Sequence, residues 1–223
     1  MKKLSRVKNN TNKSIMWTCG LCVNHTGKMA GMISISSSCK SNDFCKRMHE
    51  VKGTICEKCY SHKQMERQPS TAGKYAESTV DLTTRLLNFE EIPTITHEYG
   101  VARLEAFGEL NNSIQVMNYF EICRRNPEIN FALWTKRPEL INEVISMGIS
   151  KPENINIIWS TLMINGTPQI GRYDFVDGYF TVYSKEYAEE HNIKINCGGR
   201  KCLECLNCYD YHDSIFIINE LLK

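Results

Sequence analysis

The sequence predicts an α/β fold with a parallel sheet, and two observations support this fold class. Residues 70–196 alternate between apolar runs of strand length and segments with helical spacing. Such strand–helix–strand alternation is typical of parallel sheets joined by right-handed crossovers. The chain of 223 residues is also long enough to bury a core without crosslinks. We therefore expect a doubly wound sheet or a parallel-stranded TIM-like barrel, partial or complete, with cysteine-rich metal-binding segments at its N- and C-terminal ends.

The individual elements follow from local patterns. Helical spacing predicts helices in STAGKYAESTVDLTTRLLNF, NSIQVMNYFEICRRNP and RPELINEVISMG, and a short helix in KEYAEEHN. Pro138 near the start of the third helix and Gly148 at its end match the usual preferences of helix termini. Strands are predicted for YGVARLEAFG, which ends at Gly108, and for INFALWT, NINIIWST, GYFTVYS and IKIN.

The cysteines divide the chain into three segments. We expect a cysteine-rich metal-binding segment over residues 1–65, a barrel-like core over 66–196, and a cysteine cluster with an apolar tail over 197–223. The basic N-terminus lacks the apolar stretch of a secretory signal, and no apolar run is long enough to cross a bilayer. We therefore expect a cytoplasmic protein with no membrane partner. Eleven cysteines, an odd number in a reducing compartment, indicate metal binding rather than disulfides.

The strongest metal-binding signal is the C-terminal stretch CGGRKCLECLNCY, which contains Cys197, Cys202, Cys205 and Cys208. Structural zinc usually takes two separate C-x-x-C knuckles from distant segments. A C-x-x-C-x-x-C run instead resembles the spacing in ferredoxins, and the neighbouring glycines let backbone amides approach the sulfurs. This pattern favours an iron–sulfur cluster of the 4Fe-4S type, with zinc as the alternative.

Six further cysteines lie in the N-terminal segment, and they allow more than one partition. Two C-x-x-C pairs would on their own suggest a zinc site. Alternatively, Cys39 or Cys45 joins the second pair on an iron–sulfur cluster, so that the protein holds more than one cluster. Histidines 25, 49, 62 and 212 are further candidate ligands, whereas Cys123 is expected to be a buried core thiol. The candidate metal ligands of this segment are Cys19, Cys22, Cys39, Cys45, Cys56 and Cys59.

Polar residues follow most of the predicted strands. In parallel α/β folds functional groups gather at the carboxyl ends of the strands, so these residues are expected on one shared rim, with Cys197 after the last strand. Arg103 and Glu105 share one face of their predicted strand, where a buried ion pair is the alternative to a functional role. The candidate catalytic residues are Arg103, Glu109 and Lys136, and the candidate cofactor-binding residues are Glu109, Asn111 and Ser160.

At ICEKCYSHK, RLEAFGELNN, FALWTKRP and the terminal cysteine run, the sequence resembles the phage gene product 88 family. The shared features are a C-x-x-C-Tyr segment, a strand of the form Arg…Gly-Glu, a strand ending in Thr-Lys and a terminal cysteine cluster. The resemblance spans about residues 25–212 and implies a phage protein located in the host cell cytoplasm.

That family is in turn similar to radical S-adenosylmethionine (SAM) enzymes, which combine an α/β barrel with a three-cysteine cluster whose open iron binds SAM. This similarity implies that Glu109, in Phe-Gly-Glu, receives the amino group of SAM in place of a Gly-Gly-Glu motif. The C-x-x-x-C-x-x-C motif of those enzymes is absent from this chain. Cys56 and Cys59 keep its final pair, the third ligand comes from Cys45 or Cys39, and the C-terminal run corresponds to an auxiliary cluster.

Three functions follow from these patterns. The first is an iron–sulfur redox or radical enzyme that acts on an unidentified substrate. The second is a non-catalytic protein whose metal sites staple the terminal segments onto the barrel, for binding a host or viral protein partner. The third is a zinc protein acting on nucleic acid. Nucleic acid is not indicated, because the formal net charge is only +2 and no basic stripe is interleaved with aromatic residues.

Overall fold

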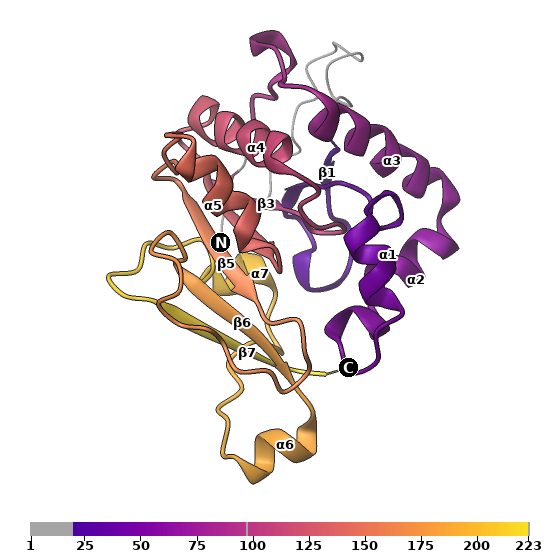
Figure 1. Cartoon of the computed structure of the whole chain (residues 1–223), viewed down its shortest axis with the longest axis vertical. Helices are drawn as coiled ribbons and strands as arrows, with labels where there is room; N and C mark the ends of the chain where they lie inside the picture. Colours follow the sequence, from indigo (N-terminus) through magenta and orange to yellow (C-terminus); the bar gives the residue numbers. More distant parts are fainter. Residues whose placement is uncertain (1–19, 97, 223) are drawn as a thin grey trace.

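The protein is an α/β molecule built on one mostly parallel sheet. The structure, a computed structural model, describes residues 20–96 and 98–222. Within these residues seven strands form a single sheet in the order in which they occur along the chain (Figure 1). The first two strands are antiparallel, and every later neighbour pair is parallel. The predicted α/β class with a parallel sheet is therefore confirmed.

The elements have the following bounds. The strands are β1 (Leu21–Val23), β2 (Ile33–Ile35), β3 (Val101–Leu104), β4 (Asn130–Thr135), β5 (Ile155–Ser160), β6 (Gly178–Tyr183) and β7 (Phe216–Leu221). The α-helices are α1 (Asp43–His49), α2 (Tyr60–Arg67), α3 (Pro69–Thr84), α4 (Ser113–Arg125), α5 (Pro138–Ser146), α6 (Lys185–Glu190) and α7 (Cys202–Cys205). The 3-10 helices are η1 (Gly27–Met29), η2 (Cys39–Ser41), η3 (Ile55–Lys58) and η4 (Phe89–Glu91).

The helix-facing side of the sheet, called here the outer face, is apolar. The register aligns Ile35, Leu104, Leu133 and Ile157 in one row across four strands, and all four are completely buried. Side chains of α3, α4 and α5 belong to the same apolar cluster. Because the parallel strands are consecutive and their crossovers are expected to be right-handed, these helices lie on one side of the sheet. Figure 1 shows α6 projecting away from this helical layer.

Local signals set the ends of the two central helices. Asn112 caps α4, because its side-chain oxygen accepts a hydrogen bond from the backbone N–H of Gln115 at 3.1 Å. Pro138 lies in the first turn of α5, as the sequence predicts, and Gly148 follows the helix with a left-handed φ of +86°.

The opposite side of the sheet, called here the inner face, is covered by the C-terminal cysteine segment. Met32, Val101, Ala132 and Ile158 line this face and pack in one cluster with Tyr209. The Tyr209 hydroxyl group lies 3.0 Å from the sulfur of Met32, and its ring centroid lies 6.2 Å from that of Trp134. The cysteine segment therefore forms part of the core of the protein.

The sheet differs from the prediction at its ends. IKIN (193–196) was predicted as the last strand, but its residues are largely exposed and only the next residue, Cys197, makes an isolated bridge, to Glu220. The apolar tail instead supplies β7, which pairs with β6 over six residues. In the described part of the chain, no pairing joins β7 to β1 or β2, so a closed barrel is not shown. Strands from all three sequence segments are joined in this one sheet.

Candidate functional site

Four cysteines from the N-terminal segment gather beside the carboxyl ends of β2 and β3. We call Cys39, Cys45, Cys56 and Cys59 the N-terminal thiol group. Asn42 caps α1 through the backbone N–H of Cys45, and its side-chain amide donates to the backbone oxygen of Glu109 at 2.8 Å. These contacts fix the cysteine segment onto the turn that follows β3. Electrostatic interactions link Cys39 with Cys59, Cys45 with Cys39 and Cys56, and Cys56 with Cys59.

Burial favours the neutral form of three thiols of this group, those of Cys39, Cys45 and Cys56. Burial raises the pKa of Cys39 to about 12, with the neighbouring sulfur of Cys59 acting in the same direction. Burial also raises the pKa of Cys45 and of Cys56, while the ammonium group of Lys136 opposes the shift at both. A metal bound here would have to displace these protons. Over residues 20–96 and 98–222, no three cysteine, histidine or acidic side chains are arranged as a metal site.

Cys22, His49 and His62 are further candidate ligands in the described part of the N-terminal segment. Cys22, on β1, lies 3.3 Å from the hydroxyl oxygen of Ser34 and 3.1 Å from that of Tyr75. Cys19 lies outside the described residues. His49 and His62 stack with ring centroids 4.1 Å apart, and Nε2 of His62 is buried without a hydrogen-bond partner. Burial lowers the pKa of His62, and His49 adds to that effect, so His62 offers a neutral ring nitrogen.

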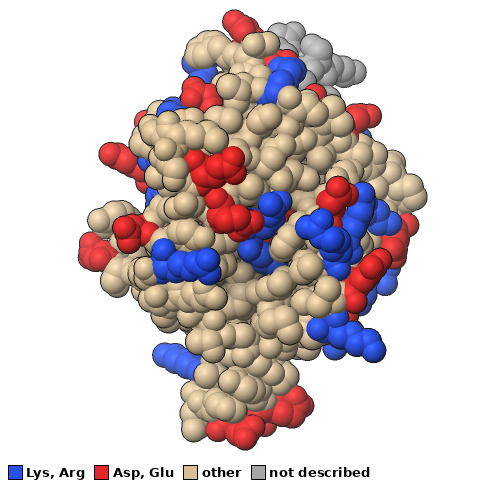
Figure 2. All heavy atoms as spheres, viewed as in Figure 1, with Lys and Arg blue, Asp and Glu red and all other residues tan. Residues whose placement is uncertain are grey.

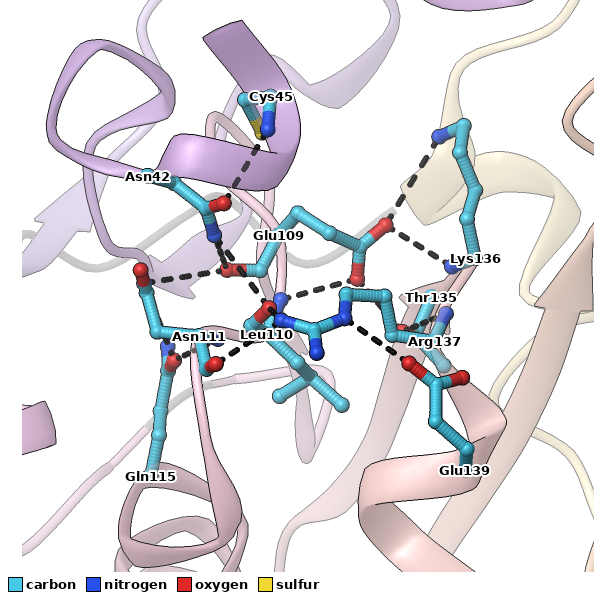
Figure 3. Close-up of polar contacts among 10 residues, drawn as sticks. All are labelled: Asn42, Cys45, Glu109, Leu110, Asn111, Gln115, Thr135, Lys136, Arg137 and Glu139. Carbon is cyan, nitrogen blue, oxygen red and sulfur yellow. Dashed lines mark hydrogen bonds and ion pairs between the residues drawn. The ribbon is translucent and has the colours of Figure 1, made fainter. Parts of the chain in front are cut away.

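The carboxylate of Glu109 lies at the same end of the sheet, between Cys45 of the N-terminal thiol group and Lys136 (Figure 3). It accepts hydrogen bonds from the hydroxyl group of Thr135 at 2.5 Å and from the backbone N–H groups of Leu110 at 2.9 Å and Lys136 at 2.8 Å. The ammonium nitrogen of Lys136 lies 3.9 Å from the nearer carboxylate oxygen. A carboxylate has about four acceptor positions, so about one is left for a donor from outside the chain.

Asn111 and Arg137 fasten the same turn. The Arg137 guanidinium donates to the backbone oxygens of Leu110 at 3.0 Å and Asn111 at 2.9 Å. The backbone N–H of Asn111 donates to the side-chain oxygen of Gln115 on α4 at 2.8 Å. The turn that carries Glu109 is thus held by both α4 and the start of α5, which favours a fixed position for its carboxylate.

Glu105 is a buried carboxylate that sequence reasoning did not select as a candidate. It accepts hydrogen bonds from Ser37, from the side-chain amide of Gln115 and from the hydroxyl group of Tyr119. Burial raises its pKa to about 7, although the Tyr119 hydrogen bond acts in the opposite direction. A Glu just past an apolar strand, with Gln and Tyr one turn apart on the next helix, is the signal that would have found it.

The strand containing Arg103 ends earlier than predicted. β3 stops at Leu104 rather than Gly108, because Glu105 adopts a left-handed backbone with φ of +54°. The alternation of side chains is broken there, so Glu105 points to the side of α4, whereas Arg103 stays on the inner face. The expectation that the two share one face is wrong. The Arg103 guanidinium instead lies 4.0 Å above the ring of Trp134, between Ser34 and Ala132 in the register.

A second set of thiols lies on the inner face. We call Cys197, Cys202, Cys205 and Cys208 the C-terminal thiol group. All four line a cavity of about 40 Å³. The ammonium group of Lys28 donates to the sulfur of Cys197 at 3.0 Å and pairs with Glu220 at 2.8 Å. Burial raises the pKa of Cys208 to about 12, against the influence of Arg103.

The predicted site residues therefore divide between two places. Glu109, Lys136 and Ser160 lie at the carboxyl ends of their strands, and Lys136 and Ser160 line one cavity of about 310 Å³. Arg103 and Cys208 lie on the inner face, where the side-chain amide of Asn156, near the start of β5, donates to the backbone oxygen of Cys208 at 3.1 Å. The C-terminal thiol group is thus largely separate from that rim, although Cys197 bridges to Glu220 near the carboxyl end of β7.

The surface and the helices add two observations. Basic and acidic side chains are interspersed on the face shown in Figure 2. None of the helices in the described ranges is both long and apolar enough to cross a membrane.

The fold and the two thiol groups define a cysteine-rich parallel α/β protein with thiols gathered from both ends of the chain. The chain belongs to the Gene product 88 family of phage proteins, which it matches over residues 2–216. The family prediction is thus confirmed, while the similarity to radical SAM enzymes stays a prediction. Neither the curated proteins nor the solved structures gave a match to this chain.

Proposed function

We propose that this phage-family protein binds iron–sulfur clusters through its two thiol groups. The observation that carries the proposal is the inner-face cavity of about 40 Å³, which is lined by all four cysteines of the C-terminal thiol group. Four thiolates in C-x-x-C-x-x-C spacing are a donor set suited to a four-iron cluster. The cavity is smaller than such a cluster, so the thiols would have to separate on loading. A bound cluster would supply one-electron transfer.

The charges beside this group support an anionic centre. Four thiolates around a four-iron core of charge +2 leave a net charge of about −2. Two cations, Lys28 and Arg103, lie within electrostatic range of Cys202. Arg103 has no carboxylate partner in the described part of the chain, and its Nε atom is buried without a hydrogen bond. A partly buried guanidinium without an anion is unfavourable, and a cluster would provide that anion.

The N-terminal thiol group is proposed as the second and more reactive centre. It lies at the carboxyl ends of the strands, where parallel α/β proteins place functional groups, beside Glu109 and Lys136. In this reading Glu109 holds the Lys136 ammonium in place, and the one acceptor position left on Glu109 is the point at which the amino group of SAM would bind. Radical or other redox chemistry on a small substrate is the reaction class that this arrangement would serve.

A structural role for the C-terminal thiol group is the second candidate function. Its segment covers the inner face and adds Tyr209 to the core, so a cluster there would staple the end of the chain onto the sheet. Lys28, which precedes β2, is paired with Glu220 on β7. This ion pair brings the first and last strands of the sheet toward each other. We propose that the sheet resembles one half of a barrel. This segment covers its open side, where a full barrel would have further paired strands.

Anaerobic purification with iron and sulfide analysis tests the proposal. We expect a brown protein with about eight iron atoms and about eight sulfides per chain if both groups hold four-iron clusters. Cys205→Ser should remove about half of the iron, and Cys56→Ser should remove the other half. Cys123→Ala is the matched control, because that thiol is completely buried on α4 outside both groups. A colourless protein with stoichiometric zinc, or one without metal after anaerobic reconstitution, would refute iron–sulfur binding.

A further inference from the structure

The largest cavity described above lies at the carboxyl ends of β4 and β5, under residues 161–169. Its volume of about 310 Å³ is at the lower end of the range for small-molecule sites. Its lining includes Trp159, the hydroxyl-bearing residues Ser160 and Thr161, and Lys136. The function proposed above does not use this cavity.

The roof of the cavity is fixed by backbone hydrogen bonds. Leu162 accepts from the N–H of Ile55 at 2.9 Å, and the N–H of Ile164 donates to Gly53 at 3.0 Å. The hydroxyl group of Tyr179 donates to the backbone oxygen of Gln169 at 3.2 Å. The cavity is therefore built in advance of any ligand. Its roof is attached to the segment that leads directly into Cys56, so a bound molecule would lie close to the N-terminal thiol group.

The charge inside the cavity has one sign. Lys136 is the one charged residue among those that line it, and no Asp or Glu does so. The Lys136 side chain is only 20% exposed, and among the described residues its one ion-pair partner is Glu109 at 3.9 Å. Within the described residues, no acceptor lies within hydrogen-bonding distance of its ammonium nitrogen. Three N–H donors are thus available, and an anionic group on a ligand would satisfy them.

The aromatic side chains at the cavity wall favour a ligand with a flat ring. The Trp159 ring is supported by Tyr173 at a centroid distance of 5.5 Å and by Tyr179 at 6.0 Å, so its position is set by packing. Aromatic rings prefer offset-stacked or tilted partners, and a planar ligand would complete the set. The hydroxyl groups of Ser160 and Thr161 lie on the same lining and offer hydrogen bonds to ring substituents.

We propose that this cavity binds a small planar heteroaromatic molecule that carries one anionic group. The ring packs against Trp159, and the anion takes hydrogen bonds from the Lys136 ammonium. Both carboxylates and phosphates have the required charge, so the test uses one probe of each kind. This inference is independent of metal binding, since it depends on residues that are not cysteines.

The test is titration calorimetry with nicotinate and uridine 5′-monophosphate, and with their neutral counterparts nicotinamide and uridine. At least one anionic probe should bind, and Lys136→Met should weaken that binding by about tenfold or more while leaving the neutral probe unchanged. Preference for nicotinate or for the nucleotide identifies the anion as carboxylate or phosphate. Lys185→Met is the matched control, because Lys185 is 72% exposed on α6.

A second variant covers the case in which Lys136→Met does not fold. Thr161→Phe places a ring in the cavity from its rim and should abolish binding of both anionic probes while leaving Lys136 intact. Equal binding of the anionic probes by the wild type and by a folded Lys136→Met variant would overturn the proposal. So would the absence of binding to the wild type at millimolar probe. Metal analysis of the same samples reports separately on the iron–sulfur proposal.

Discussion

Substitution of Glu109 by Gln should lower the free energy of unfolding by about 3 kcal/mol. Two unit charges 3.9 Å apart attract by about 4 kcal/mol at an effective dielectric constant of about 20. Removal of one partner of a buried pair typically costs about 3–5 kcal/mol. The glutamine oxygen can still accept from Thr135, but its NH₂ group faces a backbone N–H donor. The cost should still fall at the low end of that range, because the hydrogen bonds from Thr135 and Leu110 both go to the oxygen that is kept and only the one from Lys136 is lost.

Urea denaturation under reducing, anaerobic conditions measures this change. Glu139→Gln is the matched control. Glu139 pairs with Arg137 at 3.0 Å (Figure 3), but its side chain is 54% exposed. That variant should change stability by no more than about 0.5 kcal/mol. The double variant with Lys136→Met should cost less than the sum of the two single changes, because the ion pair is counted in both.

The reasoning would be refuted if Glu109→Gln cost less than about 1 kcal/mol, no more than the exposed control. Glu109 would then be free for a ligand, as the similarity to radical SAM enzymes implies. In that case SAM added to the reduced protein should change its electron paramagnetic resonance signal, and the change should disappear in Glu109→Gln.

Three further predictions concern other parts of the molecule. Burial raises the pKa of Glu105 from 4.5 to about 7. Between these two pH values the folded protein holds a proton that the unfolded chain has released, so the free energy of unfolding falls as the pH rises from 4.5 to about 7. The stability difference between wild type and Glu105→Gln should shrink by about 3 kcal/mol over the same window, and a constant difference would contradict this. Gly178→Ala would place a Cβ atom 2.6 Å from the Phe216 ring. The free energy of unfolding, measured by heat or urea, should fall by about 1–3 kcal/mol. An unchanged unfolding midpoint would show that the ring moves freely. Arg103→Met should change the stability of metal-free protein by less than about 1 kcal/mol but reduce the iron retained after desalting; equal iron retention would argue against charge balance by Arg103.

Sequence patterns predicted the centre of the fold well. The strands β3 to β6 and the helices α4 and α5 all lie where apolar periodicity places them, because each buries an apolar side against the next element. β2 was missed because a serine lies within it and serines follow it, and Ser34, Ser36 and Ser37 are completely buried. Buried serines satisfied by neighbouring groups do not produce an apolar pattern. β7 was taken for a tail because nothing local tells a strand from an apolar terminal run.

The site was predictable in its residues but not in its arrangement. Glu109, Lys136 and Ser160 were selected from their positions after strands, and they do lie at one end of the sheet. The separation of Glu105 from Arg103 depends on the backbone of Glu105, where a non-glycine residue adopts a left-handed conformation that sequence rules do not anticipate. The separation of the two thiol groups depends on how the C-terminal segment crosses the inner face, which is a property of tertiary packing.

The contacts that cover the inner face join residues very far apart along the chain. Tyr209 reaches Met32 across 177 positions, and Lys28 reaches Glu220 across 192. During synthesis, Val101, Ala132 and Ile158 are made long before their partners emerge from the ribosome. A nascent chain therefore carries an uncovered apolar surface until late in translation, so a translational pause near residue 197 would favour aggregation over assembly.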